Sequence, residues 1–278
     1  MELKHPLPPG RSYDQLLNHY NIEKALAEKL KNSDRETRRH IFASMYDELF
    51  SKVPDHPRLT QRSSDRVTAI TNKVKASIID RFIDKLSTYV EFAPGDCRFA
   101  IETAKKVNEV FGIDISDQRN PADIFPQNFK LIIYDGYSIP ELKENTIDIV
   151  FSYQLIEHLH PEDTKLHFEL VNKILKPGGR YVFQTPHALS GPYDISMFFS
   201  DEPEGFHLKE WKYSEIKSLV KETGYSSFQT RWSAGGFDFQ LPYLYFFSCE
   251  SLLRSFPKPR IKKVAKRLIP MLYGVAVK

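Results

Sequence analysis

The spacing of apolar residues along the chain changes near residue 88. Before this point apolar residues recur every three or four positions, which is typical of helices that bury one face. Apolar residues form one such face over 41–53, and a helix that begins after Ser64 would carry another over 67–86. A shorter helix that precedes both can be capped by Ser12. We therefore expect residues 1–87 to form a helical cap or lid without a motif of its own.

After residue 88 short apolar runs alternate with helical patterns. The strand candidates are TYVEFA (88–93), EVFGIDI (109–115), KLIIYD (130–135), IDIVFSY (147–153), RYVFQT (180–185) and LYGVAVK (272–278). The helix candidates between them are 96–106, 121–127, 161–175 and 213–224. This alternation predicts an α/β fold with a parallel sheet and crossover helices, in one domain over 88–278.

Composition narrows the class of protein. The chain has 278 residues, 41% of them hydrophobic, and a formal net charge of +3, which is too small to imply a nucleic-acid partner. Its two cysteines are too few for a disulfide framework, so we expect a reducing, cytoplasmic setting. The N-terminus has no apolar signal core, and no apolar run approaches membrane-spanning length.

The loop YVEFAPGDCR (89–98) joins the first strand to a helix. Free N–H groups at a helix start can bind a ligand, and Gly95 lets the backbone approach it closely. A nicotinamide-dependent oxidoreductase would place more glycines here, but Ala93 and Cys97 occupy two of those positions. Glu91 before the turn suits a ligand with a cationic end better than a pyrophosphate, and so counts against that alternative.

Five segments, in order, resemble the class I S-adenosylmethionine (SAM) dependent methyltransferases of the ubiquinone-methylase-like group (methyltransferase type 11/12). They are VEFAPGD (90–96), FGIDIS (111–116), IIYDGYSIP (132–140), FSYQLIEHLHPED (151–163) and LKPGGRYVFQTPH (175–187). The resemblance implies a Rossmann-like sheet of order 3-2-1-4-5-7-6 with the last strand antiparallel. Ala93 and Cys97 depart from the glycines of the family loop.

The resemblance also implies where SAM would bind. The methionine part would lie on the first loop, the ribose hydroxyls on the acid that ends the second strand, the adenine after the third strand, and the remaining contacts after the fourth. The implied cofactor-binding residues are Glu91, Ala93, Gly95, Asp114, Ile115, Asp135, Gly136, Tyr153 and Gln154. Purely structural roles remain open for the acids, because strand-end acids can be solvated or can cap turns.

Four histidines are candidates for a catalytic base, which suits histidine near neutral pH: His158, His160, His187 and His207. His187 and His207 follow the fifth strand and are slightly favoured, although each of the four could instead pack near SAM, cap a helix or line a pocket. The spacing of His158 and His160 would serve a metal, but no cysteine or carboxylate cluster accompanies the pair. We therefore expect no metal.

The acceptor is less well defined by the sequence. We expect the acceptor to be a small molecule, a specialised metabolite or modified peptide that is methylated most readily at a hydroxyl or carboxylate oxygen. We also expect Tyr13 or Tyr20 of the cap to reach the acceptor pocket. The aromatic segment 235–247 would form either an apolar wall or core. The basic segment 254–270 would be a solvated helix face or would contact anionic lipid. The alternatives are methylation of a lipid-like quinone at a membrane, and a non-catalytic SAM-binding subunit.

Overall fold

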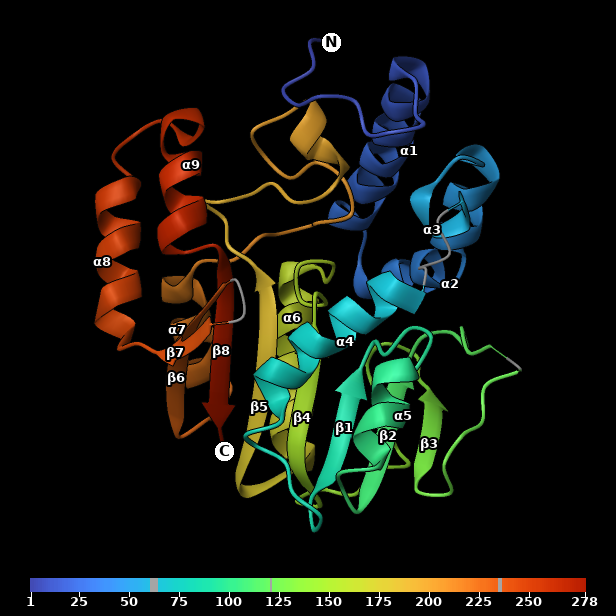
Figure 1. Ribbon diagram of the computed structural model, residues 1–278, viewed down its shortest axis with the longest axis vertical. Coiled ribbons are helices and arrows are strands. Elements are labelled where there is room, and N and C mark those ends of the chain that lie inside the picture. The colour runs from blue at the N-terminus through green and yellow to red at the C-terminus, as the bar shows by residue number, and fades with distance from the viewer. Residues whose placement is uncertain (61–64, 121, 235–236) are drawn as a thin grey trace.

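An eight-stranded sheet forms the centre of the protein, shown in Figure 1 as a computed structural model that describes residues 1–60, 65–120, 122–234 and 237–278. The strand order is β3-β2-β1-β4-β5-β8-β6-β7. The strands are β1 (Thr88–Phe92), β2 (Glu109–Asp114), β3 (Phe129–Ile133), β4 (Ile147–Tyr153), β5 (Leu175–Pro186), β6 (Ser227–Ala234), β7 (Phe237–Gln240) and β8 (Met271–Val277).

The sheet confirms the expected topology. β1 to β5 pair in parallel, and β8 lies antiparallel between β5 and β6. In addition, β7 forms an antiparallel hairpin with β6 at the sheet edge. Gly274 of β8 is needed where these strands meet, since a Cβ there would lie 2.6 Å from the Phe183 ring and 2.7 Å from the Phe228 ring.

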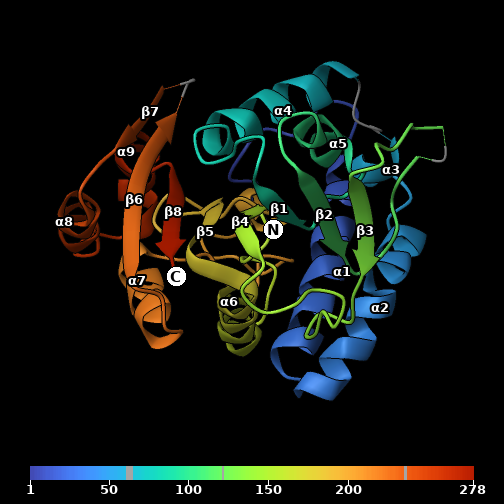
Figure 2. The ribbon, with the colours of Figure 1, turned by 90° about the horizontal axis from the view of Figure 1, so that it is seen from below.

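Helices cover both faces of the sheet, with α4 and α5 on one face and α6 and α7 on the other (Figure 2). The helices are α1 (Tyr13–Lys31), α2 (Arg35–Lys52), α3 (Pro57–Thr60), α4 (Asp65–Ile79), α5 (Arg98–Ala104), α6 (Pro161–Ile174), α7 (Tyr213–Glu222), α8 (Tyr243–Leu253) and α9 (Lys258–Leu268), with a 3₁₀ turn η1 (Ile195–Phe198). Among the described residues, no helix combines the length and apolarity that a membrane span requires.

Two details of the predicted helices are corrected by the structure. The expected apolar stripe of α4 is buried only at Ile78, whereas Val67 and Ile70 are more than half exposed, because only the C-terminal end of this helix packs against the sheet; Ser64 lies outside the described residues. The segment 122–127 forms turns and irregular backbone rather than a helix, in keeping with Pro126, and residue 121 lies outside the described residues.

The N-terminal helices pack against the insertion that follows β5. Leu16 and Tyr20 of α1 form one apolar cluster with Ile195 and Phe199, and a second cluster joins α1 and α2 to Phe206. Figure 1 shows α1, α2 and η1 gathered beyond the C-terminal ends of the central strands. The cap therefore lies at the edge of the sheet where open α/β proteins bind their ligands.

A buried ion pair ties α2 to the start of α6. Arg38 is 1% exposed and donates to both carboxylate oxygens of Asp163, at 2.7 and 2.8 Å. The Tyr137 hydroxyl donates to the same carboxylate at 3.1 Å. Because both side chains are almost fully buried, loss of one partner would leave the charge of the other poorly compensated.

We expect Arg38→Leu to lower the free energy of unfolding by about 3–5 kcal/mol, because the buried Asp163 would keep only the mostly exposed Arg35, at 3.9 Å, as a counter-ion. The double variant Arg38→Leu/Asp163→Leu should recover much of this loss. The control Arg35→Leu, on the same helix but mostly exposed, should change stability by no more than about 1 kcal/mol. Urea unfolding would measure the stability of all three variants. Equal losses for the Arg35 and Arg38 variants would contradict a special role for the buried Arg38–Asp163 ion pair.

Candidate active site

A cavity of about 510 Å³, here named the first cavity, opens at the C-terminal ends of β1, β2 and β4. Its floor comes from the residues that follow these strands and its roof from α2 and α4. The lining includes Phe42, Met45, Tyr46, Lys75, Ala93, Gly95, Asp114, Ile115, Gly136, Tyr153, Gln154 and His158. This is the position that the rule for open α/β sheets predicts for a ligand.

The loop after β1 adopts a glycine-type conformation with a single glycine. Ala93, Gly95 and Cys97 have φ angles of 52°, 59° and 63°, all in the left-handed region. That region is strained for residues with a Cβ, and such strain is concentrated at functional sites. The two positions where this sequence departs from the family glycines therefore keep the backbone that glycine would provide.

Asp114 links the end of β2 to this loop. Its carboxylate accepts the Gly95 N–H at 3.3 Å and the Ser116 N–H at 3.3 Å, and its side chain is buried at the cavity floor. Asp114 therefore caps the turn, as one of the interpretations of the sequence suggested, and it also lines the first cavity. Ile115 lies beside it and is exposed to the cavity.

Glu91 lies behind the cavity lining. It is 1% exposed, and one carboxylate oxygen accepts a hydrogen bond of 2.9 Å from Lys75 of α4, which does line the cavity. Its other oxygen, Oε2, is buried and has no partner in the described part of the chain. Burial raises the pKa of Glu91, and the adjacent Lys75 counteracts that rise.

The residues after β3 divide into two groups. Asp135 accepts the N–H groups of Tyr137 and Ser138 at 2.9 and 2.8 Å and pairs with Arg39 of α2 at 2.6 Å, so its carboxylate is turned away from the first cavity. Gly136 lines the cavity with a φ of 90° and open space where a Cβ would be. Backbone and tyrosine rings, not Asp135, therefore face the cavity here.

Several features of the first cavity fit an elongated polar ligand such as SAM. Gly95 and Gly136 leave open space above their Cα atoms. The side-chain amide nitrogen of Gln154 is buried without a partner among the described residues, as is Glu91 Oε2. Gln154 is held in place by its own N–H, which donates to the Gln184 carbonyl at 2.9 Å. Unpaired buried polar atoms beside a cavity are expected where a ligand supplies the missing partner.

A second cavity of about 370 Å³ adjoins the first, and Tyr46 and His158 line both. It lies between the cap helices and the insertion after β5. Its polar lining is Arg11, His19, Glu23, His56, Tyr193, Asp194 and His207. Most of these residues come from segments that carry no recognisable motif, so sequence reasoning missed them.

His158 and His207 are oriented by their Nδ1 atoms. Nδ1 of His158 lies 2.9 Å from the Phe206 carbonyl, which can only accept, so Nδ1 carries the proton and Nε2 the lone pair. Nδ1 of His207 lies 2.9 Å from Glu210. Burial lowers the pKa of His207, but the bond to Glu210 and the nearby Glu157 outweigh it, so the pKa lies above its ordinary value. Burial raises the pKa of Glu157 to about 7.

The other two predicted histidines lie outside both cavities. His160 caps α6 by accepting the Glu162 N–H. His187 is fully buried, with Nε2 2.9 Å from Glu250. The sequence slightly favoured His187 and His207, but the structure brings His158 and His207 together, with ring centres 5.0 Å apart. His167, which sequence reasoning did not consider, also lines the first cavity, and burial lowers its pKa to about 3.

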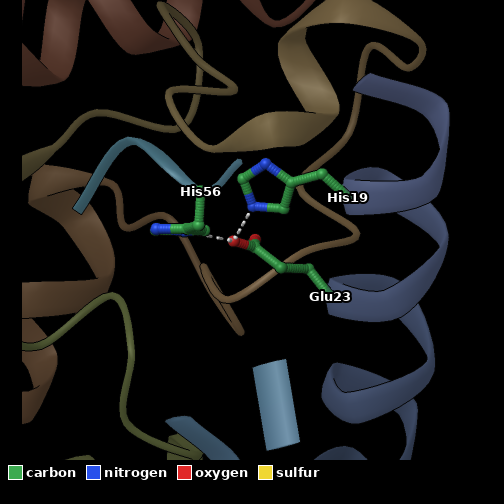
Figure 3. Close-up of side chains that lie close together, drawn as sticks. All are labelled: His19, Glu23 and His56. Atoms are coloured by element: carbon green, nitrogen blue, oxygen red, sulfur yellow. Dashed lines mark hydrogen bonds and ion pairs between the residues drawn. The ribbon is translucent and has the colours of Figure 1, made fainter. Parts of the chain in front are cut away.

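A cluster of His19, Glu23 and His56 in the second cavity has the composition of a metal site (Figure 3). Arg11 donates to His19 Nδ1 at 2.9 Å, so His19 Nε2 carries the proton and donates to Glu23 at 2.7 Å. A metal-binding histidine needs an acceptor at its other nitrogen, and here a guanidinium occupies that place. Burial acts against ionisation of Glu23, yet the bonds from His19 and His56 hold its pKa at about 2.

A second group of potential ligands is formed by Glu157, His158 and His207, whose ligand atoms lie within 4.8 Å of one another. Unlike His19, both histidines here have an acceptor at Nδ1, so this donor set is compatible with a cation. The absence of a metal, expected from the sequence, therefore stays a prediction.

For the aromatic segment 235–247 the structure agrees with the core alternative rather than the pocket wall, and the expectation for Tyr13 and Tyr20 is not met. The described aromatic residues of 235–247 do not line either cavity; Phe246 stacks on Tyr213 in the core, with ring centres 4.0 Å apart, and Gly235 and Gly236 lie outside the described residues. Tyr13 and Tyr20 are also absent from both linings. Tyr46 of α2 occupies the junction of the cavities instead.

The sequence family described as a methyltransferase domain matches residues 90–183. Phosphoethanolamine N-methyltransferase 1 of wheat (Triticum aestivum) is 36% identical in an alignment of 100 residues that covers 33% of this chain. The match covers only 20% of the wheat protein's length.

Solved structures share the fold at low sequence identity. A SAM-dependent methyltransferase from Archaeoglobus fulgidus matches 80% of this chain and 100% of its own, with 15% identity and a TM-score of 0.54. The 1,6-didemethyltoxoflavin-N1-methyltransferase of Burkholderia thailandensis, solved with its substrate and S-adenosylhomocysteine, matches 100% of this chain and 93% of its own, with 13% identity and a TM-score of 0.51. The family match places a methyltransferase domain at residues 90–183, and the sheet order and the cavity position agree with the class I, SAM-dependent fold of such domains.

Proposed function

We propose that the protein methylates a small molecule with a hydroxyl or amine group, which binds in the second cavity while SAM binds in the first. The observation that carries this proposal is the junction of the two cavities at Tyr46 and His158. Methyl transfer requires the acceptor to approach SAM from such an adjoining space. Alignment of two reactants in this way can supply roughly 7–11 kcal/mol of the barrier reduction.

The first cavity offers a role for each part of the cofactor. Asp114 would accept the ribose hydroxyls, Gly136 and its neighbouring backbone would meet the adenine, and the turn around Gly95 would hold the methionine part. SAM itself supplies a methyl group on a positively charged sulfur. The protein then has to orient the acceptor, exclude water and accept a proton.

Charge in the second cavity favours a particular acceptor chemistry. Glu23 is held ionised by its histidine partners, and Asp194 lies on the same lining. The charge of Arg11 is balanced by Asp55 at 2.6 Å. An amine is attracted to the ionised Glu23, and a hydroxyl can hydrogen-bond to it. Both the O-methylation expected from the sequence and the N-methylation named for the wheat relative are compatible with this cavity.

His158 is the best-placed base in this proposal. Its Nδ1–H bond to Phe206 leaves Nε2 as the proton acceptor, and it lines both cavities. A positioned base contributes about 10²–10⁴-fold. His207 would act as a hydrogen-bonding group for the acceptor, since its pKa is raised and it tends to keep its proton.

Residues 1–87 would act as a lid for the domain 88–278. Helices α2 and α4 supply the roof of the first cavity, and α1 supplies His19 and Glu23 to the second. In this arrangement neither cavity is complete without the cap. The cap would thus define the acceptor and also keep water from the methyl group.

Asp114→Asn should weaken binding of S-adenosylhomocysteine by about 1.5–3 kcal/mol, the range for hydrogen bonds to a charged group. The side chain keeps its size, so the fold should persist. Calorimetry would measure this, with NAD as a control ligand that should not bind to either protein. An unchanged dissociation constant would show that the ribose is held elsewhere.

His158→Ala should lower turnover by about 10²–10⁴-fold while affinity for S-adenosylhomocysteine stays within a few-fold. His160→Ala, a neighbouring histidine outside both cavities, should leave turnover nearly unchanged. Wild-type turnover should fall as the pH is lowered, because a protonated histidine cannot accept a proton, and the variant should lack this fall. A panel of amines and phenols would provide the acceptor. Normal turnover in His158→Ala would contradict the role of His158 as a base. Alignment of acceptor and SAM would then be the main contribution of the protein to catalysis.

A second candidate function, contact with an anionic membrane, is favoured by the surface of α8 and α9. Leu244, Leu252 and Phe256 are more than half exposed, and Phe247 is 43% exposed, around one hairpin of helices. In both views α8 is the outermost helix at its end of the sheet (Figures 1 and 2). Exposed lysine and arginine side chains lie beside this apolar surface. None of the following has a carboxylate at ion-pair distance among the described residues: Arg254, Arg260, Lys263 and Arg267. Apolar insertion beside basic residues is typical of peripheral membrane binding.

Vesicles that contain phosphatidylglycerol should therefore bind the protein, and pure phosphatidylcholine vesicles should not. Arg260→Glu/Lys263→Glu should abolish flotation with the anionic vesicles, whereas the charge-matched control Lys73→Glu/Lys221→Glu should not. Added salt should weaken the binding, because surface charges are screened. If the protein binds no vesicles, and its molecular mass in solution rises with protein concentration, this surface would instead be assigned to contact with a second copy of the chain.

A further inference from the structure

The first cavity has one strongly basic residue in its lining. Of the described residues that line it, only Lys75 is a lysine or arginine. Three lining residues are aspartates: Asp96, Asp114 and Asp163. The last of these is neutralised by Arg38. Positive charge is therefore confined to one place in a cavity that is otherwise neutral or acidic.

Lys75 is held firmly in that place. Its side chain is 12% exposed, and its ammonium bonds Glu91 at 2.9 Å. The same ammonium lies over the rings of Phe99 and Tyr153, at 5.4 and 5.7 Å from the ring centres. These contacts fix the lysine beside the loop after β1, where the methionine part of SAM is expected. A fixed, desolvated cation interacts with an anion more strongly than an exposed one does.

The charges of the cofactor match this distribution. SAM carries a positive sulfur, a positive ammonium and one negative carboxylate. Among the described lining residues, the carboxylate has a single strongly basic group to which it can bind. The sequence assigned Glu91 to the cofactor's ammonium, but Lys75 covers one oxygen of Glu91 in the structure.

On the basis of the proposed binding of SAM in the first cavity, we propose that Lys75 binds the carboxylate of SAM and that Glu91 is a positioning residue that holds Lys75 in place. The cap thus contributes to the cofactor site as well as to the acceptor site. It also follows that the protein should distinguish ligands that differ only in this carboxylate. Neither the family motifs nor the sequence spacing identifies Lys75, because it belongs to a helix before the first strand.

The test compares S-adenosylhomocysteine with its decarboxylated analogue, which keeps the adenosine, the sulfur and the amine. By calorimetry, the wild type should bind S-adenosylhomocysteine about 10–100-fold more tightly than the analogue, the ratio that corresponds to a hydrogen bond with a charged group. Lys75→Met should reduce this preference to a few-fold at most, and Lys75→Arg should keep most of it. Lys73→Met, an exposed lysine of the same helix, should behave as the wild type.

Lys75→Met leaves Glu91 buried without its partner and could impair folding. The double variant Lys75→Met/Glu91→Gln removes both charges and should fold, with the same loss of preference. Retention of the preference in this double variant would overturn the proposal. So would tighter binding of S-adenosylhomocysteine by the double variant, since that would show that Lys75 obstructs the cofactor site. A loss of affinity for both ligands equally would assign the lysine a structural role only.

Discussion

The turn between β1 and α5 is the constraint on which the first cavity depends. Three residues of this short turn have left-handed φ angles, and two of them are not glycines. The backbone is therefore held in a costly conformation by its surroundings, in part through Asp114, which accepts the Gly95 N–H. This turn leaves open space above Gly95, and the cofactor cavity begins in that space.

The cap converts an open sheet edge into two connected chambers. Its helices form apolar clusters with the insertion after β5, and Arg38 joins them to α6 through a buried ion pair. Since the second cavity lies between these two segments, both would determine which acceptor can enter. In the proposed function, the sheet would hold the cofactor and the added segments would shape the remaining space, so a common methyltransferase sheet could serve a particular substrate.

Buried charge is distributed unevenly over the two chambers. The first cavity has a fixed cation, Lys75, at one end and carboxylates along its floor. The second has an ionised Glu23 held by histidines, while His158 presents a proton acceptor where the chambers meet. The proposed zwitterionic cofactor and protic acceptor fit this pattern. Orientation and proton acceptance are the contributions that this arrangement can make to methyl transfer.

The sequence by itself determined the five parallel strands and β8, because strand runs act locally and appear as contiguous segments; the strand order and the cofactor class followed from the resemblance of its motifs to a known family, and β6 and β7 were not predicted. It also placed Gly95, Asp114, Gly136, Tyr153 and Gln154, which do line the first cavity. Only the tertiary structure decided which residues far apart in the chain meet. It turned Asp135 toward Arg39, buried His187 against Glu250, and brought Lys75, Tyr46 and Glu23 to the cavities. These residues belong to a cap and an insertion whose positions depend on long-range apolar packing, and helical periodicity shows that a face is buried but not what it is buried against.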